Sequence, residues 1–517
     1  MKTPFFRNIQ KALQLALFAE KTGLPLDELC ELPTISRRKF IQHTSLAGSA
    51  LFLPKTILDQ KRQPKIAIIG AGLAGLSAGY HFKKSGLDFT LYEASRRVGG
   101  RVLSVSNTIA KNVTVEYGAE FIDTNHADML AYIEEFDLQK IDTKAESEAK
   151  YIQNVYYFDK KRYNDRDLVE ALKDIAPKIL NNARQMASVD YQNPDRFGYD
   201  KISIDEYFSK IGIKGWVADL LKTAYTGEYG LDSGEQSSLN FLYLVPSESL
   251  NIIRPRAKSL PKSFDLFGAS DERYKTLGGN QQIPNKIVSK IEKNIKYGHK
   301  LEAIQENSNG SFKLKFEGKS EFSADIVLMA LPFTVLRTLD IKKVKLEDFK
   351  RKSIMEMGYG TNSKLMMGFQ ERAWRKQNYL GYMYTKDIHT GWDSSLLQNA
   401  NIGEASFTVF HGGNIGKNMK ITEYDKYLSL VNEVYPGLEN STNAKKTVMN
   451  WTQNPYSKGS YTCYKVGQFG EIGFAESVPH GNLFFIGEHC DSDFQGFMNG
   501  AAKSGRETAM QIVERLK

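Results

Sequence analysis

The order of apolar and polar positions near residue 65 predicts a strand, a helix and a second strand. Residues 65–69 form a short apolar run rich in β-branched side chains, which is typical of a buried strand. A helical pattern follows through Ala78, Phe82 and Gly86, and residues 89–92 form the next apolar run. This alternation is typical of a parallel sheet covered by helices, so we expect an α/β fold.

The pattern becomes helical between Asp128 and Pro255. Four apolar residues recur at helical spacing and predict one buried face: Leu168, Leu172, Ile175 and Ile179. Ser203 and Glu206 have the spacing of a capping box, in which each side chain accepts a hydrogen bond from the backbone of the other. We therefore expect a helical insert in this region.

The composition is that of a globular protein. The 517 residues are 41% hydrophobic, enough to bury large cores and to form about three domain-sized units. Residues 1–63 hold ten Lys and Arg against five Asp and Glu, so they carry much of the formal net charge of +9. The remaining chain is only mildly basic, which argues against nucleic acid as a partner.

The cysteines and the longest apolar runs exclude two further classes. Cys30, Cys463 and Cys490 match neither a zinc site nor a disulfide framework, so no metal is expected. A disulfide between the last two stays open. No apolar stretch is long enough to cross a bilayer as a stable helix, so we expect no membrane span.

A basic motif in the leader resembles the twin-arginine export signal. Residues 36–41 read Ser-Arg-Arg-Lys-Phe-Ile, and a modest apolar stretch, 45–54, follows them. This route carries folded proteins, and the resemblance implies a bacterial protein in the periplasm or secreted. A basic surface pair before a short amphipathic segment is the alternative. Upstream, a helical apolar stripe has no assigned role: Phe6, Ile9, Leu13 and Leu17.

Glycines follow the first predicted strand at the spacing of a dinucleotide-binding turn. Residues 70–75 read Gly-Ala-Gly-Leu-Ala-Gly. Gly70, Gly72 and Gly75 would allow the tight turn, the approach of a pyrophosphate and close packing of the helix, whose N-terminal N–H groups face the phosphates. Glu93, after the second strand, can accept hydrogen bonds from ribose hydroxyls. These features predict a dinucleotide site.

The residues after this acid distinguish FAD from NAD. The stretch 93–101 reads Glu-Ala-Ser-Arg-Arg-Val-Gly-Gly-Arg. It resembles the Glu-x-x-x-Arg-x-Gly-Gly-Arg continuation of the flavin amine oxidase superfamily, with Arg97, Gly99, Gly100 and Arg101 in the matching positions. The resemblance implies an FAD-binding domain of the Rossmann type, in which Arg101 neutralises phosphate.

Further segments resemble the same family. Residues 116–121 read Glu-Tyr-Gly-Ala-Glu-Phe and resemble the segment whose backbone passes along the flavin ring, where small residues permit a close approach. Leu301 would contact adenine through its backbone. Glu488 would hold the ribityl and pyrophosphate groups, and the helix N-terminus near Phe497 would face the flavin's pyrimidine oxygen.

The cofactor-binding residues that this resemblance implies are spread along the whole chain. They are Gly70, Gly72, Leu73, Ala74, Gly75, Glu93, Ala94, Arg97, Gly100, Arg101, Gly118, Ala119, Glu120, Phe121, Leu301, Gly487, Glu488, Gly496, Phe497 and Met498.

Four residues are expected at the reacting end of the flavin by the same resemblance. Lys364 takes the position of a lysine that holds a water at flavin N5, which suits proton transfer during reoxidation by oxygen. Tyr461 and Phe497 take the positions of two facing aromatic rings that align the amine, and Trp451 lies near them. Ser460 stands where the monoamine oxidases carry a cysteine bonded to the flavin, so we expect non-covalent FAD.

The implied reaction is the oxidation of a carbon–nitrogen bond. A neutral amine loses hydride from its α carbon to flavin N5, water hydrolyses the imine, and oxygen takes the electrons to give hydrogen peroxide. No side chain need act as an obligate base. The expected partners are therefore a small amine or amino acid and O2, and a homodimeric assembly stays open.

The substrate stays open between amines and L-amino acids. L-amino-acid oxidases of the superfamily bind the substrate carboxylate with an arginine just after the flavin-facing Gly-x pair, where this chain has Glu120 and Phe121. Arg254 or Arg256 could supply a bidentate clamp instead, or both could be surface residues.

Acids near the expected pocket leave a second question open. Glu120, Asp491 and Asp493 could attract the second cationic end of a polyamine, or they could be solvated charges. Two rival classes also stay open. One is a desaturase of the same superfamily with a long apolar substrate, and the other is a flavin-binding protein without turnover.

The positions of the motifs predict a discontinuous domain organisation. We expect a leader, an FAD-binding domain in three segments, a helical part of the substrate domain and a sheet part with strands near 365–369 and 406–410. The predicted segments are 1–63 for the leader, 64–125, 275–335 and 445–517 for the FAD-binding domain, 126–274 for the helical part and 336–444 for the sheet part.

Overall fold

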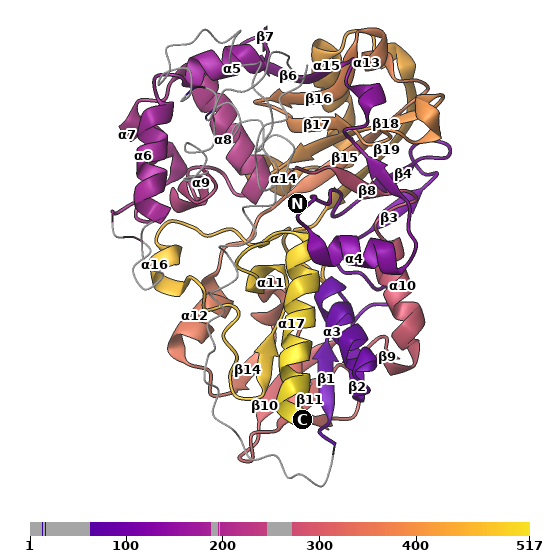
Figure 1. Ribbon diagram of the computed structural model, residues 1–517, viewed down its shortest axis with the longest axis vertical. Coiled ribbons are helices and arrows are strands. Elements are labelled where there is room, and N and C mark those ends of the chain that lie inside the picture. The colour runs from indigo at the N-terminus through magenta and orange to yellow at the C-terminus, as the bar shows by residue number, and fades with distance from the viewer. Residues whose placement is uncertain (1–12, 14–15, 17–62, 188–194, 196, 246–270) are drawn as a thin grey trace, which may run out of the picture.

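A computed structural model gives the fold of the chain. It describes residues 13, 16, 63–187, 195, 197–245 and 271–517. The described part mixes helices with a five-stranded, a seven-stranded and a four-stranded sheet and two strand pairs (Figure 1). This architecture confirms the predicted α/β class.

A parallel five-stranded sheet forms the lower part of the molecule in Figure 1. β1 (Ile66–Ile69) and β2 (Phe89–Tyr92) are the two strands that the sequence predicts, and α3 (Leu73–Lys84) connects them. The other strands come from later in the chain, and the order is β20 (Leu483–Phe485), β13 (Ile326–Met329), β1, β2 and β9 (Ile295–Lys296). Every neighbouring pair is parallel, so the carboxyl ends of the strands share one edge.

The last helix of the chain packs on the first helix of this sheet. α17 (Met498–Leu516) lies beside α3 in Figure 1, and α4 (Ala127–Glu135) covers the end of both. A Cβ at Gly505 would clash with the carbonyl oxygen of Ala74, so glycine permits the close packing of these helices. The Ser77 hydroxyl joins all three, because it donates to Ala502 O at 2.7 Å and lies 2.8 Å from the Tyr132 hydroxyl.

A four-stranded sheet stands beside the parallel one. Its order is β12 (Phe322–Ala324), β11 (Phe312–Phe316), β10 (Leu301–Glu306) and β14 (Asp340–Lys343). The rings of Tyr92 and Phe316 stack at 4.5 Å between centroids and join the two sheets. This packing brings Leu301 next to the end of β2.

A seven-stranded sheet forms the other half of the protein. Its order is β19 (Thr442–Asn450), β15 (Ser363–Phe369), β18 (Ala405–His411), β17 (His389–Asp393), β16 (Tyr379–Thr385), β6 (Ile152–Phe158) and β7 (Lys161–Tyr163). β15 and β18 are the strands that the sequence predicts near 365 and 406. All seven residues of each are buried.

Two features of this sheet differ from the predicted segments. β6 and β7 lie in the region expected to be helical, where the run Val155–Phe158 combines a β-branched residue with aromatic ones that favour strands. The expected boundary at residue 445 falls inside β19, which pairs with β15. Strand pairing between distant segments decides both, and no local pattern reports it.

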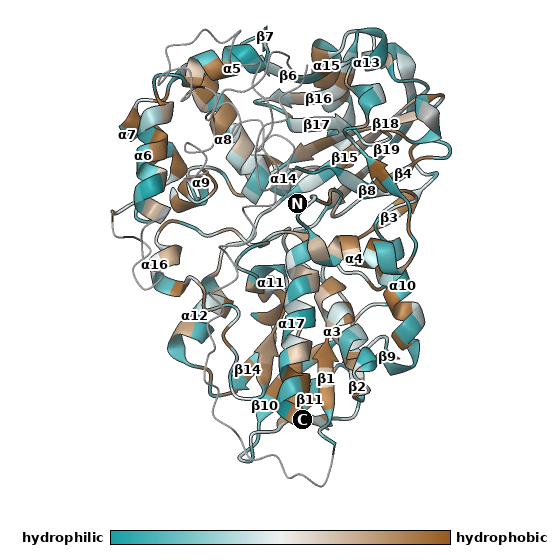
Figure 2. Cartoon of the chain, in the orientation of Figure 1, coloured by the Kyte–Doolittle hydropathy of each residue, from teal (hydrophilic) through white to brown (hydrophobic). Residues whose placement is uncertain are grey.

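The helical insert lies on the upper left of Figure 1. It consists of α5 (Asp165–Leu172), α6 (Ala176–Ala187), α7 (Ile204–Ile211), α8 (Gly215–Tyr229) and α9 (Leu239–Leu242). The capping box is confirmed, since the Ser203 hydroxyl accepts from Glu206 N at 3.1 Å and Glu206 accepts from Ser203 N at 2.7 Å. The apolar face that predicts one helix is divided between α5, with Leu168 and Leu172, and α6, with Ile179, and all three residues are buried in the main core. Figure 2 shows that both helices combine hydrophobic and hydrophilic residues.

The remaining elements connect these layers. They are β3 (Ser104–Ser106), β4 (Thr114–Glu116), β5 (Lys140–Asp142), β8 (Tyr274–Thr276), α10 (Gln282–Ile291), α11 (Phe333–Leu336), α12 (Asp348–Glu356), α13 (Ala373–Lys376), α14 (Gly413–Asn418), α15 (Tyr424–Val434) and α16 (Gln468–Ile472), with short 3-10 turns between them. Within the described ranges, no helix is both long and apolar enough to span a membrane.

Most of residues 1–63, where the sequence predicts a leader, lie outside the described residues. Leu13 and Ala16 are helical and buried in the main hydrophobic core, which agrees with the apolar stripe expected there. The twin-arginine motif, Cys30, Arg254 and Arg256 fall in the part that the structure does not describe. Cys463 and Cys490 are free thiols, so the disulfide that the sequence left open is not formed.

Candidate active site

A cavity of about 460 Å³ lies at the carboxyl edge of the parallel sheet. It brings together most of the residues that the sequence selects. Those that line it are Gly70, Gly72, Leu73, Ala74, Glu93, Ala94, Arg97, Gly100, Arg101, Ala119, Leu301, Trp451, Tyr461, Gly487, Glu488, Gly496, Phe497 and Met498. Five selected residues are not part of this lining: Gly75, Gly118, Glu120, Phe121 and Lys364.

The glycine turn after β1 shapes one end of the cavity. A Cβ at Gly70, whose φ is +106°, would lie 2.7 Å from Ala330 O, and a Cβ at Gly75 would clash with Gly70 O. A Cβ at Gly72 would instead have no described atom within 4 Å and would project into open space. Gly70 and Gly75 are therefore needed for packing, whereas Gly72 keeps space for a ligand.

The start of α3 presents backbone donors to the same space. Among the described residues, no side chain caps this helix at Gly72, and its first turn holds no acidic residue. Unpaired N–H groups and the helix dipole favour an anion at such a terminus. Glu93 lies beside it and accepts from Ala71 N at 2.8 Å and from Ser95 N at 2.8 Å, which fixes its carboxylate at the cavity edge.

The two arginines of the glycine-rich continuation have different roles in the structure. The Arg97 guanidinium donates to loop carbonyls, at 2.9 Å to Val98 O and 3.0 Å to Val102 O, and also to Gly100 O. It holds the loop, and Arg97 also lines the cavity. Arg101 crosses the cavity wall, donating to Glu488 Oε1 at 2.9 Å and to Ser460 O. Arg101 therefore connects the glycine-rich segment near residue 100 with Ser460 and Glu488 near the end of the chain.

The segment 487–498 supplies a further part of the cavity lining. Glu488 follows β20, and its Oε2 accepts from Gly496 N at 2.9 Å. α17 begins at Met498, and no described side chain caps it. His489 is a lining residue that the sequence analysis missed. Its imidazole is buried, and neither nitrogen has a hydrogen-bond partner among the described residues.

Three aromatic residues belong to the same cavity lining. The Tyr461 hydroxyl donates to Gly227 O at 3.1 Å, and burial raises the pKa of this phenol well above its usual value, so it is a neutral donor. Trp451 donates through Nε1 to Tyr117 O at 3.0 Å. The Phe497 ring packs edge-on against His126, with 4.9 Å between centroids. Partners on other segments thus fix Tyr461 and Trp451.

Lys364 and Glu120 form a buried ion pair next to the cavity. Lys364 is fully buried, and its Nζ donates to Glu120 Oε2 at 2.8 Å, Gly118 O at 2.9 Å and Glu116 O at 3.0 Å. An ammonium has three donors, so all of them are used by protein acceptors. The Glu120 carboxylate points into this network and not toward the cavity. Neither side chain is part of the cavity lining.

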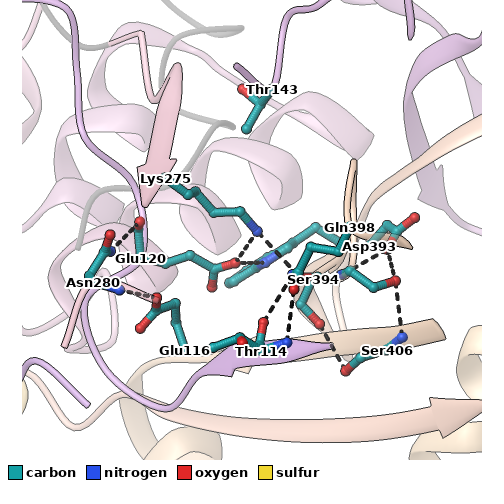
Figure 3. A network of polar contacts seen from close by, with 12 residues as sticks. Thr114, Glu116, Glu120, Thr143, Lys275, Asn280, Asp393, Ser394, Gln398 and Ser406 are labelled. Atoms are coloured by element: carbon teal, nitrogen blue, oxygen red, sulfur yellow. Dashed lines mark hydrogen bonds and ion pairs between the residues drawn. The ribbon is translucent and has the colours of Figure 1, made fainter. Parts of the chain in front are cut away.

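A second lysine, which the sequence analysis did not select, completes the network around Glu120 (Figure 3). Lys275 donates to Glu120 Oε1 at 3.1 Å and to Ser394 O at 3.2 Å. Trp392 donates through Nε1 to the same Oε1 at 3.1 Å. Burial alone raises the pKa of Glu120, but Lys364 and Lys275 reverse this and lower it, so the carboxylate is charged.

Asn280 and Glu116 hold the backbone of the same segment. Asn280 Nδ2 donates to Glu120 O at 2.7 Å and to Ala119 O at 3.2 Å, and its own N–H donates to Glu116 Oε1 at 2.8 Å. Ser104 donates to the other Glu116 oxygen at 2.7 Å. Burial raises the pKa of Glu116 to about 7, although both hydrogen bonds oppose the rise.

The remaining selected residues are also accounted for. Phe121 packs on Trp392, with 5.8 Å between ring centroids. Asp491 and Asp493 both pair with Lys503, at 3.1 and 2.6 Å, so neither is an isolated acid facing a ligand. The Ser460 hydroxyl donates to Asn362 Oδ1 at 2.6 Å. Among the described residues, no group of His, Cys, Asp or Glu could hold a metal ion.

The site fits a dinucleotide cofactor. Gly72 opens onto the cavity, and α3 and α17 both begin at it without a described side-chain cap. The buried imidazole of His489 has no hydrogen-bond partner among the described residues. An extended anionic ligand would satisfy these groups.

Comparison with known proteins identifies the family. The model of the flavin containing amine oxidoreductases matches residues 73–513. The chain belongs to this family. Flavin-containing amine oxidoreductases use FAD, so the cofactor of this oxidoreductase is FAD.

Similar proteins cover almost the whole oxidoreductase. A putative L-amino-acid oxidase of Bacillus subtilis, YobN, is 24% identical over 88% of this chain and 96% of its own length. The flavin-containing amine oxidase A of Sus scrofa is 23% identical over 87% of this chain and 85% of its own. Among solved structures, cyclohexylamine oxidase from Brevibacterium oxydans has a TM-score of 0.74 at 19% identity, covering 88% of this chain and 100% of its own. A putrescine oxidase bound to putrescine has a TM-score of 0.72 at 17% identity, covering 88% and 99%. These structures share the fold.

Proposed function

We propose that this oxidoreductase oxidises a small amine or L-amino acid and passes the electrons to O2, giving hydrogen peroxide. The observation that carries the proposal is the continuous lining of one cavity, from the phosphate-type turn at Gly72 to the aromatic side chains of Tyr461, Phe497 and Trp451. A cofactor held at the first end would present its reactive end to these aromatic residues. Bound FAD supplies the hydride acceptor and the route for electrons to oxygen.

The chain's own residues bind and orient in this proposal. The starts of α3 and α17 stabilise negative charge, and Arg101 neutralises phosphate beside Glu488. Tyr461 and Phe497 align the amine between their rings. Tyr461 cannot serve as a base, because its pKa lies well above the usual value. The substrate must therefore lose its ammonium proton before or on binding.

The Phe121 position supports an amine without a carboxylate as the substrate. Glu120 and Phe121 stand where the L-amino-acid oxidases of the superfamily are expected to carry an arginine, and the Phe121 ring packs on Trp392. Lys275 Nζ lies 5.7 Å from the centroid of the Phe121 ring, but it donates to Glu120 and to Ser394 O. Similarity to L-amino-acid oxidases, such as that of Crotalus adamanteus at 23% identity, supports the amino-acid alternative.

Ser460 supports FAD that is bound without a covalent link. Its hydroxyl donates to Asn362, and a serine oxygen cannot form the thioether that a cysteine forms at this position. We expect the flavin to leave the protein on denaturation in acid. Flavin that stays with the precipitated protein would contradict this part of the proposal.

An anaerobic reduction screen tests the function. Holoprotein is mixed without oxygen with monoamines, diamines and L-amino acids, and the flavin absorbance is followed. Bleaching by amines and not by amino acids is the expected result, with peroxide formed when air is admitted. Bleaching by amino acids alone would select the other substrate class, and no bleaching across the panel would favour a desaturase or a flavoprotein without turnover.

We also propose export of the folded protein through the twin-arginine motif at residues 36–41. Replacement of Arg37 and Arg38 by lysine should retain the protein in the cytoplasm of its native cell. Unchanged fractionation of this variant would argue against the proposal.

A further inference from the structure

Lys275 has no role in the function proposed above, yet it is a buried charge next to the candidate site. It is 4% exposed, and Glu120 and Lys364 beside it are 1% and 0% exposed. Buried charges are costly unless they are paired, so the arrangement needs an explanation. The three residues come from three separate segments, and tertiary packing alone brings them together.

The network holds more positive than negative charge. Glu120 accepts from Lys275 through Oε1 and from Lys364 through Oε2, so two lysines share one carboxylate. Their other acceptors are neutral carbonyls, Ser394 O for Lys275 and Glu116 O and Gly118 O for Lys364. Burial raises the pKa of Glu116 to about 7, so at pH 6 this carboxyl is mostly protonated and does not balance the second lysine.

This charge lies directly behind the cavity wall. Lys364 binds the carbonyl of Gly118, and the next residue, Ala119, lines the cavity. Lys364 Nζ lies 5.3 Å from the ring centroid of Trp392, and Lys275 Nζ lies 5.7 Å from that of Phe121. These rings exclude water on that side. In such a dry environment a unit charge acts over a longer distance than in water.

We propose that Lys275 is an electrostatic positioning residue: together with Glu120 and Lys364 it keeps one unbalanced positive charge behind Ala119, and this charge stabilises negative charge on the cofactor held in the cavity. The role rests on the proposed function only in requiring bound flavin. It is distinct from the expected role of Lys364 as a holder of water, because it depends on Lys275 and on the net charge of the three residues.

Substitutions at Lys275 and Glu120 separate charge from structure. The network carries one excess positive charge. Lys275→Met removes this excess, and Glu120→Gln raises it to two positive charges. The double variant, Lys275→Met/Glu120→Gln, again has one positive charge, that of Lys364. If the net charge decides the effect, the double variant should behave like the wild type. The two single variants should then differ from the wild type in opposite directions. If the network is only structural, the double variant is at least as impaired as either single one.

The measurement is the affinity of the oxidised holoprotein for sulfite, an anion that binds to flavin and bleaches its absorbance. At about pH 6 we expect Lys275→Met to weaken sulfite binding about tenfold, Glu120→Gln to strengthen it, and the double variant to lie within about threefold of the wild type. The rate at which dithionite-reduced flavin is reoxidised by O2 should follow the same order.

Controls keep the test decisive. Lys313→Met removes a lysine of β11 that pairs with Glu321. It changes the net charge of the protein by the same amount as Lys275→Met, and it should change neither the sulfite affinity nor the reoxidation rate. If Lys275→Met takes up no flavin, Lys275→Gln gives the same comparison. Equal sulfite affinity in the wild type and the uncharged variant would overturn the proposal. Neither measurement uses an amine, so failure of amine oxidation would not be confused with this result.

Discussion

The two ends of the cavity are built in different ways. At the phosphate end, one stretch of 36 residues from Ile66 to Arg101 supplies the strand, the glycine turn, the helix and the acid, and much of the wall is backbone. At the aromatic end, side chains arrive from segments around Ala119, Trp451, Tyr461 and Phe497. The first end depends on local conformation, whereas the second depends on packing, and substitutions should separate the two.

The largest effect is expected at Gly72. Gly72→Val places a side chain in open space, so the protein should fold but lose FAD affinity by about a hundredfold or more, equivalent to about 3 kcal/mol. Flavin content after purification and a thermal melt of the apoprotein check both parts. Gly75→Ala is the matched comparison, because its methyl group clashes with Gly70 O and should destabilise the fold itself. Full flavin occupancy in Gly72→Val would contradict the view that Gly72 keeps space for the cofactor.

A smaller loss is expected at the aromatic end from Tyr461. Tyr461→Ala removes the ring and should lower kcat/KM for the amine about thirtyfold with flavin still bound, because positioning of the reacting carbon is lost. Tyr461→Phe removes only the hydrogen bond to Gly227 O, worth about 1 kcal/mol, and should cost less than about tenfold. Equal losses in the two variants would mean that the hydroxyl and not the ring matters.

Arg101 joins the two ends and should show an intermediate behaviour. Arg101→Met leaves the buried Glu488 carboxylate without its partner and should lower FAD affinity about tenfold. Arg101→Met/Glu488→Gln should recover part of this loss. The exposed neighbour Arg96 provides the control, and Arg96→Met should bind FAD normally. Titration of the apoproteins with FAD distinguishes these cases.

The smallest expected effect is on the pH dependence of stability, through Glu116. Burial raises the pKa of Glu116 to about 7 in the folded state, above its ordinary value of 4.5. Protonated Glu116 therefore adds to the free energy of unfolding at low pH. This stabilisation is lost as the pH rises to about 7 and above. The apoprotein should therefore lose less stability between about pH 6 and 8 as Glu116→Gln than as wild type. Thermal melts of both at the two pH values give the difference, in which groups common to both proteins cancel. Parallel pH profiles would contradict the raised pKa.

The sequence predicted the local elements near the site well. The first two strands and α3 fall where the apolar pattern places them, and the capping box at Ser203 forms as expected. The predicted single helical face at 168–179 belongs to two helices, because α5 ends at Leu172 and α6 begins at Ala176. Local signals found the elements but not this break.

The Glu120 network shows where such reasoning stops. A glutamate after two small residues could face a ligand, a solvent loop or a lysine, and the letters around it do not distinguish these. Lys275 lies 155 positions away and carries no motif. His489 was missed for a similar reason, since a histidine beside Glu488 is chemically informative only once its burial and lack of a described partner are known.

The sequence by itself determined the family resemblance, the dinucleotide turn and the chemistry expected of the cofactor, because glycine spacing and strand–helix alternation act over a few residues. The tertiary structure alone decided which charges meet. Lys275, Glu120 and Lys364 become one buried network only after three segments pack together, and Coulomb energy depends on their distances and on the exclusion of water, neither of which is written in the order of the residues.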